Sequence, residues 1–203
     1  SEPRTHLSMG EHQALTTAQW GITREAQDEL ALRSHQRLAA AYDAGFFDDL
    51  VTPYRGLTRD ANLRADTSME KLAKLKPAFE RPYGKVTPGN SSQITDGASW
   101  VVLASEKAVE EHRLTPLARV VDSEWAALDP SIMGLGPVLS VTPLLRRHGL
   151  AREDVDLWEL NEAFAAQVLA CLSAWEDEKF CREVLGLDGV FGRVEHDRLN
   201  VDG

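Results

Sequence analysis

The chain has 203 residues, 43% of them hydrophobic, which is enough for one large domain or two modest ones with a sizeable core. Its formal net charge of -10 argues against nucleic acid as a partner, because phosphate backbones are bound by fields of Lys and Arg. No apolar run approaches the roughly 20 residues of a membrane span, and the first residues lack a signal-peptide pattern, so we expect a cytoplasmic protein.

The first predicted element is a long amphipathic helix that begins after Thr23, a good N-cap residue, and ends at Gly45. A short strand-like run over 46–54 follows it. A polar loop then leads into a short helix from Met69 to Lys74, and a loop of this length is typically functional or disordered. Residues 1–84 are therefore predicted to form a helix-rich domain.

From residue 85 onward, short apolar runs alternate with helical segments, which is typical of an α/β domain with a parallel or mixed sheet. The predicted strands are 99–105, 117–123 and 156–161, with a further strand-like run at 198–201. The predicted helices between them are 105–114 and 137–150. Residues 85–203 are expected to form a second, α/β region.

Two polar junctions follow or precede these apolar runs. Asn161 comes after a predicted strand and before a predicted helix, so it is either the helix N-cap or an amide that holds a water or an oxyanion. The turn from Gly89 to Ser92 could hold a polar ligand with backbone N–H groups and hydroxyls, although a glycine-containing turn is a weak signal. The run MGLGPVL lacks the glycine pattern of a dinucleotide fingerprint, which excludes that function.

The two cysteines and six histidines show no metal-ligand or redox spacing, so we expect no metal site. Cys171 and Cys181 are predicted to be structural, one buried and one on a helix face. His148, directly before Gly149, is expected to be a cation at a helix C-terminus.

Four blocks together resemble the thiolase family. PGNSSQITDGAS, MGLGPV and NEAFAAQ occur in the order of the family's C-terminal half, and REAQDELALRSHQRLAAAYDAGFF is similar to its loop-domain helix. The resemblance runs from about Met9 to Gly203. The stretch LSAWEDEKFCREVLG is similar to the β-subunit of the fatty-acid-oxidation trifunctional complex. The implied α/β fold is a helical loop domain over 1–84, which binds coenzyme A, followed by part of the C-terminal thiolase domain over 85–203.

The resemblance also implies roles for individual residues. Asn161 matches the asparagine that holds a water of the oxyanion hole, whereas Glu162 is expected to be structural. Arg64 matches an arginine near the adenine and phosphates of coenzyme A. Positions along the coenzyme A cleft are matched by Lys71, Leu72, Phe79, Ser92, Ala163 and Phe164. Methionines near the acyl pocket are matched by Met9 and Met133, although a methionine is as often plain core.

The activity implied is that of a 3-ketoacyl-CoA thiolase of fatty-acid β-oxidation, with coenzyme A as substrate and no cofactor. The family's nucleophilic cysteine and its Gly-His-Pro and Cys-x-Gly blocks are absent, so this chain is predicted to be inactive alone. The implied partners are acyl-CoA, other copies of the complete enzyme and a hydratase-dehydrogenase α subunit. The alternative is a non-catalytic module that binds coenzyme A or a protein partner on a thiolase framework.

Overall fold

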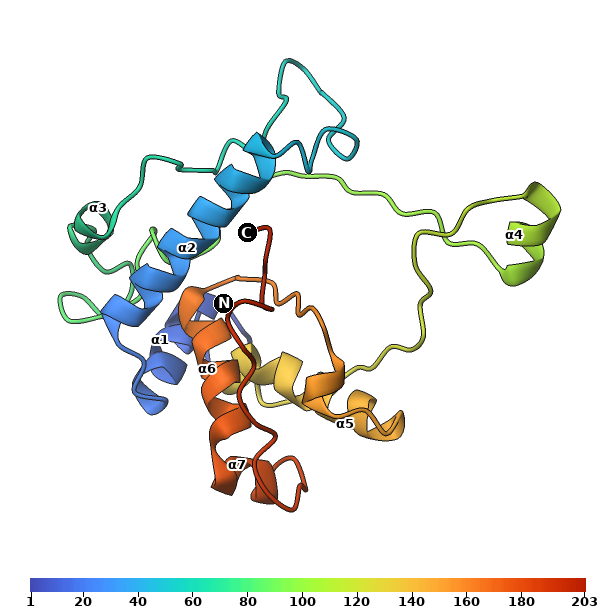
Figure 1. Cartoon of the computed structure of the whole chain (residues 1–203). Helices are drawn as coiled ribbons and strands as arrows, with labels where there is room; N and C mark the ends of the chain where they lie inside the picture. The colour runs from blue at the N-terminus through green and yellow to red at the C-terminus, as the bar shows by residue number, and fades with distance from the viewer.

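The computed structural model describes residues 1–203 and consists of helices joined by long connections (Figure 1). The α-helices are α1 (Met9–Gln19), α2 (Arg24–Asp43), α3 (Met69–Ala73), α4 (Glu106–His112), α5 (Gly136–Arg147), α6 (Ala165–Glu176) and α7 (Glu178–Glu183). Two 3-10 helices, η1 (Pro130–Leu135) and η2 (Arg152–Asp154), complete the list. No helix is both long enough and apolar enough to cross a membrane.

Helix α6 is the centre of the packed part of the molecule. Its sequence, AAQVLACLSAWE, is apolar on nearly all sides, and 9 of its 12 residues are buried, as expected for a helix surrounded by other elements. It contacts α1, α2, α5, α7 and η1. At its C-terminal end Trp175 is fully buried and packs against the rings of Trp158 and Phe191, with centroid distances of 5.6 and 5.2 Å.

The predicted helices form where local signals place them. The Thr23 side chain accepts a hydrogen bond from the Ala26 N–H, so Thr23 is the N-cap of α2 as predicted. The chain leaves α2 through Gly45, whose φ of +77° suits glycine. The predicted helices at 69–74, 105–114 and 137–150 correspond to α3, α4 and α5.

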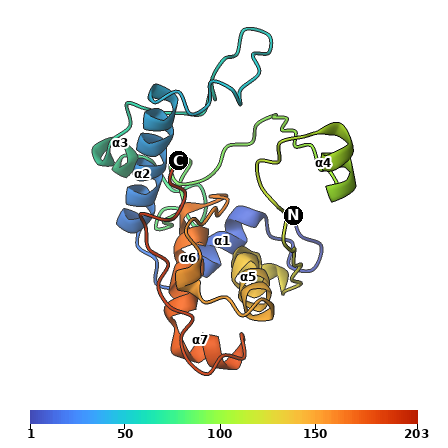
Figure 2. The same ribbon diagram turned by 45° about the vertical axis from the view of Figure 1, so that its right-hand side comes forward.

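The predicted strands are the principal error. Neither 99–105 nor 117–123 pairs with any segment; both run extended and exposed on either side of α4, with Trp100 92% and Leu117 100% exposed. Figures 1 and 2 show α4 standing apart from the other helices on these two segments. A buried strand needs neighbouring strands for its N–H and C=O groups, and this chain brings none to them.

The other strand-like runs are also shorter than predicted. Residues 46–54 form turns and an irregular stretch, with a single antiparallel bridge between Tyr54 and Leu57. The runs at 156–161 and 198–201 meet in one parallel bridge, between Trp158 and Leu199. That bridge brings the C-terminal segment beside the residues that lead into α6.

Candidate functional site

A cleft of about 840 Å³ opens between four parts of the chain that are distant in sequence. Its walls come from α2, from the loop before α3, from the turn at 88–95 and from the segment 159–165 before α6. The C-terminal residues Asn200 and Gly203 also contribute. The lining is mostly polar, which suits a ligand with several hydrogen-bonding groups.

Four of the predicted site residues line this cleft, namely Arg64, Leu72, Ser92 and Asn161. They come from positions nearly 100 residues apart in the chain. Leu72 is the buried residue of α3 and supplies apolar lining, whereas Ser92 and Asn161 are exposed and polar. The cleft therefore brings together an exposed amide, a hydroxyl and a guanidinium group.

Four other predicted residues do not line the cleft. The Lys71 ammonium group contacts the Asp66 carboxylate at 2.6 Å and is thus held against the loop before α3. The ring of Phe79 occupies the space that a side chain at Gly10 would need. Ala163 and Phe164 act through the backbone, as described below.

The two predicted acyl-pocket methionines lie away from the cleft. Met9 and Met133 line a second cavity, of about 460 Å³, at the N-terminal end of α1. His12 also lines it and is only 2% exposed, and its Nε2 atom is 2.7 Å from the hydroxyl of Thr5. Met9 is 70% exposed, so at least that methionine is not a core residue.

Asn161 is not a helix N-cap, which corrects one of the two interpretations left open by the sequence. Helix α6 begins at Ala165, and Phe164 occupies the N-cap position without a side-chain hydrogen bond. The Asn161 side chain lies four residues before the helix, is exposed on the cleft and makes no hydrogen bond within the chain. Its amide is therefore free to donate to a ligand or a water.

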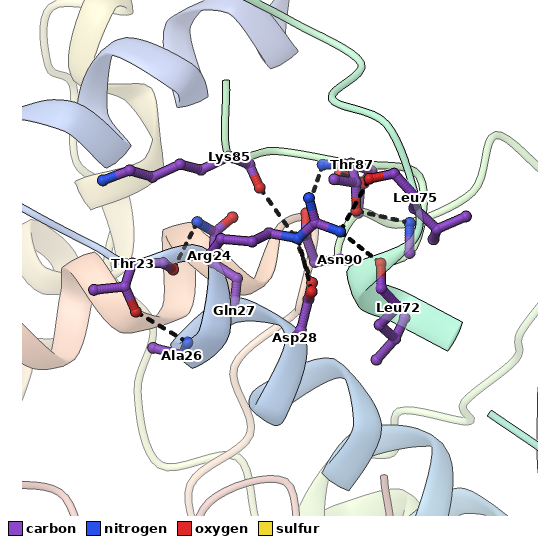
Figure 3. Close-up of polar contacts among 12 residues, drawn as sticks. Thr23, Arg24, Ala26, Gln27, Asp28, Leu72, Leu75, Lys85, Thr87 and Asn90 are labelled. Atoms are coloured by element: carbon purple, nitrogen blue, oxygen red, sulfur yellow. Dashed lines mark hydrogen bonds and ion pairs between the residues drawn. The ribbon is translucent and has the colours of Figure 1, made fainter. Parts of the chain in front are cut away.

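A buried polar network forms the support of the cleft (Figure 3). The Arg24 guanidinium group donates to the Asp28 carboxylate at 2.7 Å and to the carbonyl oxygens of Leu72 and Leu75 at 2.5 and 3.1 Å. The other Asp28 oxygen accepts from the Asn90 amide at 2.9 Å. Asp28 is 1% exposed, so its charge is compensated by these two partners. The network ties α2 to α3 and to the turn before Ser92.

The turn itself corrects the prediction that its backbone N–H groups and hydroxyls hold a ligand, because most of them are bonded within the chain. The Asn90 amide is satisfied internally: its oxygen accepts from the Thr87 N–H at 2.8 Å, and its nitrogen donates to Asp28 and to the Lys85 carbonyl. The Ser91 hydroxyl donates to the Thr87 carbonyl at 2.8 Å. Ser92, with one long contact of 3.4 Å to the Gln93 carbonyl, is the turn's exposed hydroxyl.

Backbone bonds join this turn to the start of α6. The Ser92 N–H donates to the Ala163 carbonyl at 2.9 Å, and the Ala165 N–H donates to the Asn90 carbonyl at 3.0 Å. Ser91 and Phe164 form an antiparallel bridge. Ala163 and Phe164 thus hold the Ser92 side of the cleft against the Asn161 side.

The charges of the cleft are divided between its two walls. On one wall the Arg64 N–H donates to His35 Nδ1 at 3.3 Å, and burial, followed by the nearby Arg64 charge, lowers the pKa of His35. On the other wall desolvation, followed by the carboxylates of Asp202 and Glu162, raises the pKa of Glu159. An anionic group is therefore favoured near Arg64 and disfavoured near Glu159.

Neither cysteine can serve the cleft as a nucleophile. Cys171 and Cys181 are both fully buried, and Cys171 donates to the Gly134 carbonyl at 3.2 Å. Burial raises the pKa of Cys171 to about 12, which keeps it a thiol at neutral pH. The prediction that both are structural is confirmed, although Cys181 is buried rather than exposed on a helix face.

Sequence reasoning missed His35, Asp28 and Asn200 as parts of this site. Asp28 and His35 lie within a helix whose pattern is simply amphipathic, and Asn200 belonged to a predicted strand. Each acquires its role from a partner at least 29 residues away, for which local spacing has no signal.

Comparison with known proteins shows the family of the chain. A family model described as the N-terminal domain of thiolase matches residues 2–107, and one described as its C-terminal domain matches residues 114–203. The 3-ketoacyl-CoA thiolase of Klebsiella pneumoniae (strain 342) is 40% identical over 210 residues, which is 100% of this chain and 48% of that protein.

Two solved structures are similar throughout the chain. Human mitochondrial 3-ketoacyl-CoA thiolase in complex with CoA has a TM-score of 0.85 and 38% identity, over 100% of this chain and 48% of that one. The dimeric peroxisomal thiolase of Saccharomyces cerevisiae has a TM-score of 0.84 and 31% identity, over 97% and 47%. The expected thiolase-like α/β fold is thereby confirmed, and the chain spans about half the length of the relatives it matches.

Proposed function

Because the chain belongs to the thiolase family, we propose that it is part of a 3-ketoacyl-CoA thiolase that cleaves 3-ketoacyl thioesters of fatty-acid β-oxidation. A cysteine outside this chain attacks the keto carbon of the substrate. The carbon–carbon bond breaks, acetyl-CoA leaves after protonation of its enolate, and the acyl group passes from sulfur to a second coenzyme A. Covalent catalysis divides one difficult cleavage into two easier steps.

The observation that carries this proposal is the free amide of Asn161 in the same cleft as Arg64 and Ser92. A thioester oxygen becomes negatively charged during acyl transfer, and neutral donors with a fixed position stabilise that charge without reorganising. Asn161 supplies a neutral donor of this kind, because its side chain lines the cleft and has no competing partner in the chain. We assign it to the oxyanion hole, acting through a bound water.

Coenzyme A would lie along the cleft, with its phosphates toward Arg64 and its thioester toward Asn161. Leu72 supplies apolar contact, and the Ser92 hydroxyl is available to the pantetheine amides. From the family resemblance we also propose that Lys71 and Phe79 border the adenine end and that Ala163 and Phe164 align the pantetheine side. The separate cavity at Met9 and Met133 would receive the acyl chain.

The same proposal includes the setting of the complete enzyme. We expect a cytoplasmic homo-oligomer that binds acyl-CoA and associates with a hydratase-dehydrogenase α subunit. The dimeric state of the yeast relative supports the homo-oligomer. Coenzyme A is a substrate in this scheme, and no cofactor takes part.

The test is the variant Asn161→Ala in the complete enzyme. We expect kcat for thiolysis to fall by about 100-fold to 1,000-fold with little change in KM, because one oxyanion-hole element is lost. Gln36→Ala, an exposed amide on α2 away from the cleft, is the matched control and should leave both constants unchanged.

A large rise in KM at constant kcat would make Asn161 a ground-state binding residue and would contradict the proposal. The 203-residue chain alone should show no turnover, because its cysteines are buried. A complete protein that binds coenzyme A with no turnover would favour the non-catalytic binding module instead.

A further inference from the structure

Asn200 is bonded to both neighbours of Asn161. Its side-chain oxygen accepts from the Leu160 N–H at 2.8 Å. Its side-chain nitrogen donates to the Leu160 carbonyl at 2.9 Å and to the Glu162 carboxylate at 2.8 Å. One amide thus holds the residues on either side of Asn161 and leaves the Asn161 side chain itself unbonded.

The backbone of Asn200 adds to this requirement for an asparagine. Its φ of +47° lies in the left-handed region, which asparagine, aspartate and glycine tolerate far better than other residues. Asn200 is only 5% exposed, so each of its polar atoms needs a partner, and each has one. Among these residues, only asparagine supplies both an acceptor for the Leu160 N–H and a donor for Glu162.

Asn200 is in turn fixed by α2, which also forms a wall of the cleft. Arg37 of α2 donates to the carbonyl oxygens of His196, Leu199 and Asn200, at 2.8, 2.5 and 3.0 Å. The Asn200 N–H donates to the Trp158 carbonyl at 2.9 Å. The contact therefore runs from a rigid helix through Asn200 to the segment that carries Asn161.

We propose that Asn200 is a positioning residue for the acyl-transfer reaction, which sets the orientation of Asn161 by holding Leu160 and Glu162. The inference rests on the proposed function of Asn161. Asn200 does not touch the substrate; it restrains the backbone from which the oxyanion-hole amide projects. A displacement of about 1 Å at such a donor is enough to reduce the rate strongly.

The principal variant is Asn200→Gly, which keeps the left-handed backbone and removes the amide. In the complete enzyme we expect kcat to fall by about tenfold to 100-fold, with KM for coenzyme A within about twofold, because only the placement of the oxyanion-hole donor changes. Asp197→Gly is the matched control, since Asp197 is exposed in the same loop and makes no side-chain hydrogen bond. It should retain wild-type kcat.

The double variant Asn161→Ala with Asn200→Gly separates positioning from general support. If Asn200 acts through Asn161, kcat of the double variant should equal that of Asn161→Ala alone. If the two losses multiply, or if Asn200→Gly leaves kcat unchanged while Asn161→Ala lowers it, the inference is wrong and the proposed function stands. If Asn161→Ala leaves kcat unchanged, the proposed function fails and this inference fails with it.

Hydrogen exchange in the 203-residue chain tests the anchoring without any activity. The Leu160 N–H should exchange at least about tenfold faster in Asn200→Gly than in wild type, because its acceptor is gone. Equal protection of Leu160 in both would overturn the inference. Should Asn200→Gly fail to fold, Asn200→Asp keeps the backbone and the acceptor for the Leu160 N–H but loses the donor to the Leu160 carbonyl and to Glu162. The kcat of this variant should still fall, and an unchanged kcat would contradict the positioning role of Asn200.

Discussion

Arg64 provides a local positive charge on a chain whose net charge is -10. Its Nη1 atom donates to the carbonyl oxygens of Ala61 and Leu63, at 2.9 and 3.3 Å, so the side chain curls over its own loop at the cleft. Arg64 forms no ion pair, in contrast to Lys71, which is paired with Asp66. An anion approaching this acidic chain therefore finds at the cleft a cation that is not engaged in an ion pair.

We predict that Arg64→Ala in the complete enzyme raises KM for coenzyme A about tenfold and leaves kcat nearly intact, because an exposed guanidinium–phosphate contact contributes modestly to binding. The defect should shrink at high salt, where exposed charges are screened. Coenzyme A saturation measured at low and high ionic strength gives both effects.

The matched control for this prediction is Arg59→Ala. Arg59 lies in the same loop and carries the same charge, but it stacks on the Tyr42 ring at 4.5 Å and lies 3.5 Å from the Asp43 carboxylate. Equal increases in KM for both variants would show that Arg64 acts only through the net positive charge of the loop, and not through a direct contact with coenzyme A. An unchanged KM for Arg64→Ala would exclude the assigned contact.

At the scale of elements, α2 organises the site by clamping the C-terminal segment. Arg37 binds the carbonyl oxygens of that segment, and Arg33 donates to His196 Nδ1 at 3.1 Å. Burial, followed by the charges of Arg33, Arg193 and Arg37, lowers the pKa of His196. The clamp needs a neutral histidine, because a protonated ring cannot accept from Arg33 and would add a cation beside three arginines.

The lowered pKa predicts acid sensitivity. A base whose pKa is lower in the folded state than in the unfolded one stabilises the fold fully above about pH 6.5 and progressively less as the pH falls through its folded value. The melting temperature of the 203-residue chain should therefore fall between pH 7 and pH 5. His35, whose pKa is also lowered, contributes with the same sign.

His196→Gln tests this element because an amide keeps an acceptor for Arg33 without titrating in this range. Its loss of melting temperature between pH 7 and pH 5 should be smaller than that of wild type by about 2 °C. His112→Gln, at the exposed end of α4, is the control and should follow wild type. A pH response identical to wild type in His196→Gln would exclude the histidine as a contributor.

At the scale of the whole molecule, the chain divides into a packed part and an exposed arm, residues 93–128, that carries α4 (Figure 2). The two extended stretches of the arm present large apolar side chains to solvent, with Trp100 92%, Leu117 100% and Trp125 89% exposed. Few of its backbone groups are bonded outside α4. Its C-terminal end is tied to the packed part by ion pairs of Asp122 and Glu124 with Arg147 and by Leu128, which packs against the core. The arm is therefore expected to open locally at little cost in free energy.

We predict that brief digestion of the 203-residue chain with chymotrypsin cuts the arm first, at Trp100, Leu117 or Trp125. Cleavage needs an extended, accessible backbone, and these residues provide it, whereas Trp158 and Trp175 are 6% and 0% exposed. Mass spectrometry of the early products identifies the sites. The buried tryptophans are the internal control.

The two products should stay associated on size exclusion, because α1 from the first packs against η1 and α6 from the second. Separation of the products would show that the arm itself holds the parts together. Early cleavage at Trp158 or Trp175 would contradict the packing of α6.

Local chemistry was sufficient to predict α2, α3, α4 and α5, whereas α1 and α7 were not predicted. The side chains of Thr23 and Ser68 cap α2 and α3 by accepting from the N–H of the residue three positions later. Such short-range hydrogen bonds can be predicted from the sequence. The blocks around Ser92 and Asn161 also led to the correct family, since motifs in a fixed order are a property of the sequence alone.

Only the tertiary structure decided the strands and the construction of the site. The runs at 99–105 and 117–123 have the composition of buried strands, but a strand exists only where a neighbour completes its hydrogen bonds, and no neighbour is present. Likewise the sequence did not decide whether Asn161 is a helix N-cap or an amide that faces a ligand. The start of α6 at Ala165 and the bonds from Asn200, 40 residues away from Leu160, decided that question, because contacts at such separation depend on packing rather than on local spacing.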